Sequence, residues 1–379
     1  MMDEKKHAVV TVVFWCGILI AFLAAGLLGK DRLYSEKERR VLAQKPALNT
    51  SALLDGSYKD AYEEYAADQF PGRDKWLSLK TDSEVLLGKR AINGIYLGED
   101  GYLFEQHLPW KTDTDLIDQR LTQLKELSDK YHAKAMLVPT ADQILTDKLP
   151  AGAPVYDQSD LIRQAKDRLG EQNVIDPTED LKARKEESIY YRTDHHWTTL
   201  GAYYGYLSWK AKTGSVGAVH FLPEQFICVS DTFCGTLGSR INLSGWEETY
   251  ELTDRIFYAP QTQYRPVEIT YDLKEKSDSL YEEKYLETGN QYGFFLDDNH
   301  AIAEIETGYH NGRQLFLIKD SYANCLIPFL TVHYEKITAV DLRYYNGSLF
   351  SLIEQKKTPM MDVLVLYNCI HFIEEFQYY

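Results

Sequence analysis

Four consecutive residues near the middle of the chain, Asp194-His195-His196-Trp197, combine a carboxylate, two imidazoles and an indole. Asp194 and His196 are two residues apart, so on extended backbone their side chains share a face and His195 points the other way. A carboxylate that faces an imidazole can hold its tautomer and stabilise the imidazolium that forms when the ring takes a proton. The spacing therefore predicts Asp194 as the orienting acid and His196 as a general base.

Two other interpretations of this cluster stay open. The segment could be a polar loop that caps a helix beginning after Thr198, with Trp197 simply buried. Asp194, His195 and His196 could also each ligate zinc or iron, but adjacent side chains seldom converge on one ion. Neither H-E-x-x-H nor C-x-x-C occurs nearby. We therefore predict no metal site.

A serine far downstream supplies the third group of a nucleophilic triad. The apolar run 315–318 predicts a buried strand, and Lys319-Asp320-Ser321-Tyr322 turns from it into a helix. This places the Ser321 hydroxyl at the carboxyl edge of a sheet, beside backbone N–H groups that can stabilise an oxyanion. Ser321 or Asp320 could instead serve only as a helix cap. No G-x-S-x-G surrounds Ser321, so an ordinary α/β-hydrolase elbow is not supported.

Other polar residues follow predicted strands at the same edge. Arg343 and Tyr344 come after the strand at 337–341, where a charged and an aromatic group could hold a substrate. Thr140 and Asn368 follow two further strands and are weaker candidates, since strand termination alone explains Pro139-Thr140.

The elements that must position these residues alternate between strands and helices. Helices are expected at 57–68, 74–88 and 115–131, from a cap at Ser159 to Gly170, from Thr198 to about Lys212, and at 321–330. Short apolar strands are expected at 135–138, 173–177, 314–319, 337–341 and 363–366. This alternation predicts an α/β fold whose mostly parallel sheet is flanked by helices and buried on both faces. Residues 220–310, rich in turns and short alternating runs, predict a β-rich insertion.

The N-terminal part predicts a membrane anchor. Ala8 to Gly29 carries no charge and, at about 1.5 Å per residue, spans roughly 33 Å, enough for a bilayer core. It exceeds the usual apolar core of a signal peptide, although Ala24 and Gly26 leave cleavage open. We expect a cytoplasmic tip and transmembrane helix over 1–29, a juxtamembrane connector and helical lead-in over 30–90, and a catalytic domain over 91–379.

Charge and cysteine usage restrict the function further. The formal net charge of -16 argues against nucleic acid as a partner. More lysines and arginines follow the apolar span than precede it, so the positive-inside rule alone would leave the body in the cytoplasm. None of the five cysteines has metal-ligand spacing. Cys228 and Cys234 could form a disulfide or remain separate thiols.

At several motifs the chain resembles the DHHW protein family, a bacterial extracytoplasmic group related to alginate O-acetyltransferases of the SGNH-hydrolase-like class. The resemblance runs over most of the chain. Its motifs are Glu38-Arg39-Arg40-Val41-Leu42-Ala43, Phe70-Pro71-Gly72-Arg73-Asp74, Gly101-Tyr102-Leu103-Phe104, Val138-Pro139-Thr140, Tyr190-Tyr191-Arg192-Thr193-Asp194-His195-His196-Trp197-Thr198 and Ile318-Lys319-Asp320-Ser321-Tyr322-Ala323-Asn324.

The resemblance implies roles for individual residues. The relatives' Asp-x-His-Trp motif falls on Asp194, His196 and Trp197, and their nucleophilic serine falls on Ser321. Trp197 and Tyr322, beside these groups, are expected to contact substrate together with Arg343 and Tyr344. The relatives precede their serine with Gly-Thr, whereas this chain has Lys319-Asp320. A carboxylate beside the nucleophile would oppose a developing oxyanion.

The resemblance also implies an activity: a membrane-anchored enzyme outside the cytoplasmic membrane that transfers acetyl groups to an envelope or secreted polysaccharide. It needs no cofactor but requires an acetyl donor, supplied by a carrier or by a partner such as a membrane-bound O-acyltransferase. An esterase with the same triad, or a non-catalytic polysaccharide-binding or scaffold component, are the alternatives.

Overall fold

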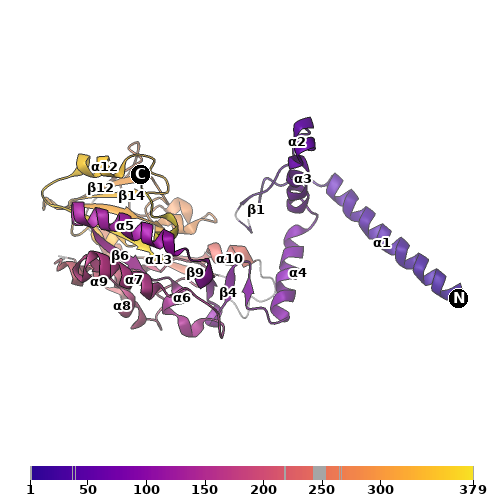
Figure 1. The fold of residues 1–379 in the computed structure, drawn as a ribbon, viewed down its shortest axis with the longest axis horizontal. Helices are drawn as coiled ribbons and strands as arrows, with labels where there is room; N and C mark the ends of the chain where they lie inside the picture. Colours follow the sequence, from indigo (N-terminus) through magenta and orange to yellow (C-terminus); the bar gives the residue numbers. More distant parts are fainter. Residues whose placement is uncertain are drawn as a thin grey trace. The chain divides into compact units, whose positions relative to one another are not determined.

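The computed structural model describes residues 2–35, 37–38, 40–216, 219–241, 253–263, 265 and 267–378 of the chain. It divides into two compact units (Figure 1). The N-terminal unit comprises Met1–Lys89 with Ser239–Trp246, and the second, which we call the sheet unit, comprises Arg90–Gly238 with Glu247–Tyr379. Every candidate residue discussed above belongs to the sheet unit.

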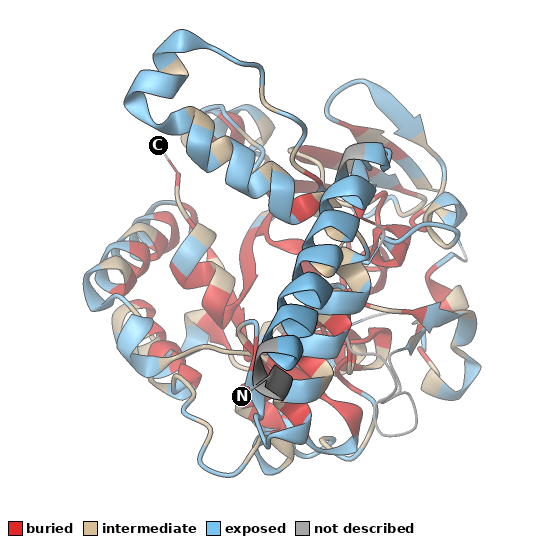
Figure 2. Cartoon of the chain, turned by 90° about the vertical axis from the view of Figure 1, so that its right-hand side faces the viewer, coloured by how far each residue is buried: buried red, intermediate tan, exposed pale blue. Residues whose placement is uncertain are grey.

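The N-terminal unit is mainly helical. Its first helix, α1, contains one segment, Lys6–Gly26, that is long and apolar enough to cross a membrane. The described side chains of α1 are nearly all exposed (Figure 2), and Phe22 stacks on Phe70 at 5.4 Å between ring centroids. The two helices predicted here are confirmed as α3 and α4. The elements are α1 (Met2–Leu28), β1 (Tyr34–Ser35), β2 (Arg40–Val41), α2 (Thr50–Asp55), α3 (Ser57–Asp68) and α4 (Arg73–Leu86).

Arginines that follow the apolar helix are held by carboxylates of the same unit. Arg40 Nη2 lies 2.5 Å from Asp68 Oδ1, and Arg32 Nη1 lies 2.8 Å from Asp74 Oδ2. The hydrogen bonds from Arg40 and the Ala43 N–H lower the pKa of the Asp68 carboxyl to about 2. Two of the arginines that follow the apolar span are therefore paired with carboxylates rather than free.

The sheet unit is built on eight strands in the order β11-β10-β12-β14-β13-β15-β6-β7. The five strands predicted from the sequence are confirmed, and they are the contiguous parallel part of this sheet. Their bounds are β6 (Lys134–Val138), β7 (Val174–Ile175), β13 (Gln314–Lys319), β14 (Lys336–Asp341) and β15 (Met361–Asn368).

The β-rich insertion extends the sheet with three strands and forms a separate two-stranded sheet with two others. Its strands β10 (Val267–Tyr271), β11 (Glu275–Ser277) and β12 (Ile302–Thr307) pair antiparallel at the β14 edge, so the sheet is mixed rather than mostly parallel. Strand β11 follows β10 after a short turn in which Asp272 and Leu273 have positive φ, a connection that only antiparallel neighbours allow. Residues 242–252 of the insertion lie outside the described residues. The other strands are β8 (Ile227–Phe233) paired with β9 (Asp254–Tyr258), and the small sheet β3 (Ala91–Ile92), β4 (Ile95–Leu97) and β5 (Leu103–Glu105).

Alternation along the central strands divides the core between two faces. In β13, Leu315 and Leu317 pack into one apolar cluster with residues of α9, whereas Phe316 and Ile318 pack into another with residues of α5, α7, α12 and α13. Burial on both faces explains why the parallel strands read as continuous apolar runs. The helices are α5 (Thr114–Tyr131), α6 (Ala141–Ile144), α7 (Gln158–Leu169), α8 (Thr178–Lys182), α9 (Thr199–Thr213), α10 (Thr236–Ile241), α11 (Ile327–Leu330), α12 (Leu349–Lys356) and α13 (Cys369–Glu375).

Three helix ends test the sequence signals directly. Thr198 caps α9 as predicted, since its hydroxyl accepts the Gly201 N–H. Asp157, rather than Ser159, caps α7. The helix predicted at 321–330 is wrong: a single 3₁₀ turn, Ser321–Ala323, is followed by α11, because Pro328 cannot donate to a preceding carbonyl. All five cysteines are free thiols.

Candidate active site

The carboxyl ends of the parallel strands bring the candidate residues to one edge of the sheet. Ser321 follows β13, Asn368 ends β15 and Thr140 follows β6, which are consecutive neighbours in the sheet. Ligands of α/β sheets bind at such an edge. Two further candidates were expected at this edge, Arg343 and Tyr344. The Arg343 guanidinium donates hydrogen bonds to Asp341 and Asn299 and lies near the Glu375 carboxylate, and Tyr344 is about half exposed beside it.

Asp194, His196 and Ser321 form one continuous chain of hydrogen bonds. The distance from His196 Nε2 to Ser321 Oγ is 2.8 Å, and that from His196 Nδ1 to Asp194 Oδ1 is 2.5 Å. A carboxylate can only accept, so Nδ1 carries the proton and Nε2 is free to take the one from the serine hydroxyl. All three side chains are buried, yet His196 and Ser321 retain about 5% of their surface.

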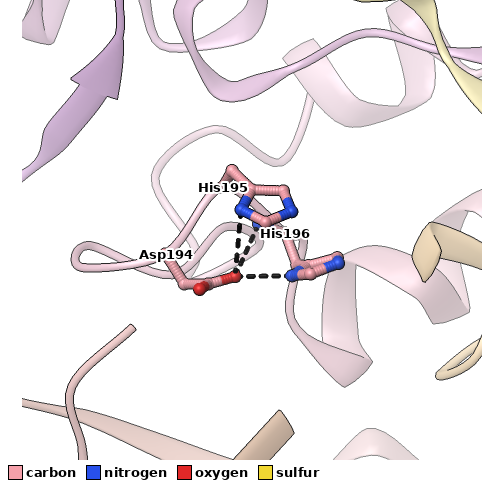
Figure 3. A group of neighbouring side chains, drawn as sticks. All are labelled: Asp194, His195 and His196. Carbon is pink, nitrogen blue, oxygen red and sulfur yellow. Dashed lines mark hydrogen bonds and ion pairs between the residues drawn. The ribbon is translucent and has the colours of Figure 1, made fainter. Parts of the chain in front are cut away.

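The loop that carries Asp194, His195 and His196, which we call the histidine loop, is bent, so the predicted direction of the His195 side chain is wrong. Asp194 Oδ1 also accepts the His196 N–H at 3.1 Å, which closes a tight Asx-type turn in place of extended backbone. His195 therefore does not point away: its ring lies 3.9 Å from that of His196, centroid to centroid, and both rings face Asp194 (Figure 3).

Asp194 is held by groups from the start of α10. Its Oδ2 accepts the Thr236 N–H at 2.9 Å, and a Cβ at Gly235 would lie 2.2 Å from the Asp194 Cβ, so only glycine fits there. Burial opposes ionisation of Asp194, but the two histidines and the Thr236 N–H hold its pKa well below its usual range. Burial and the adjacent His196 lower the pKa of His195 to about 3, so His195 is neutral near pH 7.

Trp197 and Tyr322 join the segment that carries His196 to the Ser321 turn and do not offer a surface to a substrate. Both side chains are fully buried. The Trp197 indole donates to the Tyr322 carbonyl at 2.9 Å, and the Tyr322 hydroxyl donates to the His195 carbonyl. The predicted substrate contacts of these two residues are replaced by a clamp that holds the histidine loop against the Ser321 turn.

Asp320 is directed away from the nucleophile, contrary to the concern raised by its position in the sequence. Its carboxylate is fully buried and accepts hydrogen bonds from the Tyr322 N–H, the Asn368 backbone and side-chain amides, and His371 Nδ1, all at 2.9–3.0 Å. The Tyr322 N–H is thereby consumed. Among the described residues, none accepts a hydrogen bond from the Ser321 N–H, so it is the donor left in this turn for an oxyanion.

A cavity of about 230 Å³ opens beside the triad, with Asp194, His195 and Asn368 among its lining residues. Two further aspartate–histidine pairs border it. His107 Nδ1 lies 2.9 Å from Asp142 Oδ2, and His371 Nδ1 lies 3.0 Å from Asp320 Oδ2. Burial alone would lower the pKa of each imidazole, but the paired carboxylates raise it above its ordinary value.

The ligand atoms of Asp194, His195 and His196 lie within 4.8 Å of one another, a separation that a metal ion could bridge. Their hydrogen bonds argue for a different use. His196 uses both ring nitrogens in the triad, and His195 Nδ1 lies 3.0 Å from the Thr236 hydroxyl. A metal would have to displace these contacts.

Several functional contacts come from residues that sequence reasoning missed. The Tyr292 ring stacks on His196 at 3.8 Å, and its hydroxyl donates to the Ser321 carbonyl at 3.3 Å. Asp254 accepts the Arg192 and Thr193 N–H groups and so fixes the base of the histidine loop. Among the residues missed, only His371, which borders the cavity, could have been proposed from the sequence, because it follows a predicted strand at the sheet edge.

The chain is similar to known proteins. A family model described as DHHW protein matches residues 117–340, more than half of the chain. The chain belongs to the DHHW protein family. The matched part contains the histidine loop, the Ser321 turn and four of the five parallel strands.

Among curated relatives of this DHHW chain, the probable alginate O-acetylase AlgJ of Pseudomonas putida is 27% identical over 166 residues, 40% of this chain and 42% of the relative. The protein of the same name from Pseudomonas syringae pv. tomato is 23% identical over 191 residues, 47% and 48% of the two chains. The DHHW chain thus spans less than half the length of these relatives.

Two solved structures share its fold. A DHHW family protein from Eubacterium siraeum superposes with a TM-score of 0.60 at 25% identity, covering 74% of this chain and 93% of that one. Bacillus cereus PatB1 superposes with a TM-score of 0.59 at 19% identity, covering 74% and 98%. The latter likeness concerns the fold alone.

Proposed function

We propose that this DHHW protein is an O-acetyltransferase of the SGNH-like class that acetylates a polysaccharide through Ser321, His196 and Asp194. The observation that carries the proposal is the unbroken hydrogen-bond chain from Asp194 to Ser321 at a sheet edge, beside an open cavity. The similarity to proteins named probable alginate O-acetylase supports acetyl transfer and a polysaccharide acceptor in general, without fixing which polysaccharide.

The reaction proceeds in two balanced steps. Ser321 Oγ attacks the carbonyl carbon of the acetyl donor and gives its proton to His196 Nε2, while the Ser321 N–H stabilises the oxyanion. The donor's leaving group departs with that proton. An acceptor hydroxyl then transfers its proton to His196 Nε2 and attacks the acetyl-serine, and the proton returns to Ser321 Oγ as the ester breaks. No cofactor is required besides the acetyl donor, which a carrier or a membrane-bound O-acyltransferase partner would supply.

The apolar helix α1 supports a single-pass membrane anchor. The proposed envelope polysaccharide, and not the helix, leads us to propose that the sheet unit lies outside the cytoplasmic membrane. A C-terminal reporter that is active only after export tests this orientation. Activity from a cytoplasmic reporter alone would contradict it.

A chromogenic acetyl ester with and without oligosaccharide tests the chemistry. We expect slow ester hydrolysis by the full-length protein, faster release of the leaving group when a suitable oligosaccharide is added, and an acetylated product by mass spectrometry. All three should vanish in Ser321→Ala. Efficient removal of acetyl groups from acetylated oligosaccharide, with no transfer, would identify an esterase instead. Turnover that is unchanged by Ser321→Ala would place the catalytic site elsewhere, and no turnover by the wild-type protein would leave the non-catalytic binding role.

A further inference from the structure

The cavity beside the triad has a chemical bias that bears on the acceptor. Its lining includes four carboxylates, Glu105, Asp142, Asp194 and Glu374, and three imidazoles, but no lysine or arginine among the described residues. Sites that bind carboxylates or phosphates normally use arginine or lysine, since these supply fixed positive charge and several donors. An anionic acceptor would meet repulsion here.

The two bordering histidines offer hydrogen bonds without a net positive charge. In His107 and in His371 the Nδ1 atom is committed to a buried aspartate, so Nε2 is the ring nitrogen left to face the cavity: it accepts a hydrogen bond in the neutral ring and donates one in the imidazolium. Each imidazole is balanced by its own carboxylate, Asp142 or Asp320, which leaves no charge over for an anionic ligand. A nitrogen of this kind suits a hydroxyl group, which can both donate and accept.

Acceptors lie at the rim of the same cavity. Glu374 is exposed at α13 and Glu105 is partly exposed at the end of β5. Carboxylates accept hydrogen bonds from sugar hydroxyls, whose protons need acceptors as much as their oxygens need donors. At roughly 30 Å³ per water, 230 Å³ corresponds to about eight waters, which is room for one sugar ring.

We infer that this cavity is the acceptor subsite for one sugar residue without negative charge, with Nε2 of His107 and of His371 and the Glu374 carboxylate as its hydrogen-bond partners. The inference rests on the proposed acetyl transfer and narrows its substrate class: the acceptor is a neutral glycan and not a polyuronate. A hydroxyl of the bound ring would then lie beside His195 and Asp194, which line the cavity.

Binding to the full-length Ser321→Ala protein in detergent tests the subsite without turnover. The ligands are gluco-oligosaccharide and chito-oligosaccharide as neutral chains, and oligoalginate and oligogalacturonate of equal length as anionic ones, titrated by calorimetry. We expect at least tenfold tighter binding of a neutral chain, and a smaller ratio at high salt because repulsion is screened. Oligouronate binding that is as tight or tighter, or no binding of either neutral chain, overturns the inference.

Single variants locate the effect. In the Ser321→Ala protein, Glu374→Gln should reduce the ratio of neutral-chain to anionic-chain affinity, and Glu374→Lys should reduce it further. The control is Glu179→Gln on α8, whose side chain is 86% exposed and which should leave this ratio unchanged. A ratio unaltered by both Glu374 variants contradicts the assignment.

Ester hydrolysis by the otherwise wild-type protein separates the two levels of the proposal. Ser321-dependent hydrolysis together with a preference for oligouronate refutes only the neutral subsite. Tight binding of a neutral chain, together with hydrolysis that does not require Ser321, refutes only the proposed catalysis.

Discussion

Two aspartate–histidine pairs lie close to Ser321, and they differ in what the second nitrogen of each imidazole meets. In the Asp194–His196 pair, Nε2 contacts the Ser321 hydroxyl at 2.8 Å. In the Asp320–His371 pair, Nε2 is left toward the cavity, while Asp320 ties the ends of β13 and β15 together. The first pair can therefore take a proton from the serine hydroxyl, whereas the second faces no such hydroxyl and is placed to form a hydrogen bond with a ligand. The pairing itself does not define the role.

The rings connect the two pairs physically. His371 packs edge-on against His195 at 5.6 Å between centroids, and His195 lies against His196, which stacks in turn on Tyr292. A change in one pair can thus disturb the other by packing alone, and tests of their roles need variants that preserve the ring or the shape.

The largest effect should follow loss of the catalytic pair or its nucleophile. Replacement of Ser321, His196 or Asp194 by alanine should each reduce acetyl-ester turnover by roughly 10³–10⁶-fold, and double replacements should add little because the residues act as a unit. Steady-state kinetics of purified variants measure this. Additive losses in the double variants would mean that the groups work independently.

The sequence predicted this pair from a short polar motif followed by a helix cap. A strand followed by a turn made Ser321 only one candidate, and the family resemblance selected it. The five parallel strands could also be predicted from the sequence, since each is a short apolar run buried on both faces. Two kinds of feature were not predicted. Tyr292 and Thr236 reach the site from the irregular insertion, through contacts distant in sequence. The bend that brings His195 onto His196 is local, and it depends on a hydrogen bond between residues two positions apart.

The second pair should matter most for stability. Asp320→Asn places an amide where four donors now meet a fully buried carboxylate, so at least one donor loses its acceptor. Breaking a buried charged pair costs about 3 kcal/mol or more. Chemical unfolding should show a loss of that size for Asp320→Asn. The surface pair Lys125–Asp129 gives the control: Asp129→Asn should change the free energy of unfolding by less than about 1 kcal/mol.

A moderate effect is expected at the cavity. His371→Gln keeps a side-chain hydrogen-bond donor but removes the imidazole held by Asp320, and it should weaken use of a neutral oligosaccharide about tenfold, mainly through KM. Hydrolysis of a small acetyl ester should change less, since that substrate does not reach across the subsite. Equal losses of kcat for both substrates would instead place His371 in the chemical step.

The second pair should also make stability depend on pH. The Asp320 carboxylate raises the folded-state pKa of His371, despite burial, with Glu375 3.7 Å away adding to the effect and Arg343 opposing it. A raised pKa contributes stability that is complete below the unfolded value of about 6.5 and is lost as the pH rises through the folded value. The stability advantage of the wild type over His371→Gln should therefore shrink as the pH increases above about 6.5. A constant difference between the two proteins would show that His371 is not protonated in the folded state.

The smallest effect should come from His195, although it adjoins the catalytic base. Its pKa of about 3 keeps it neutral, so it supplies no charge to the transition state, and its contribution is the ring contact with His196 and a hydrogen bond to Thr236. Aromatic contacts of this kind are worth about 0.5–1.5 kcal/mol, or roughly two- to tenfold in rate. His195→Phe preserves the stacked ring and should lose less ester turnover than His195→Ala. If His195→Ala is as damaging as His196→Ala, then His196 is not the unique base, and the geometric distinction between the two histidines fails.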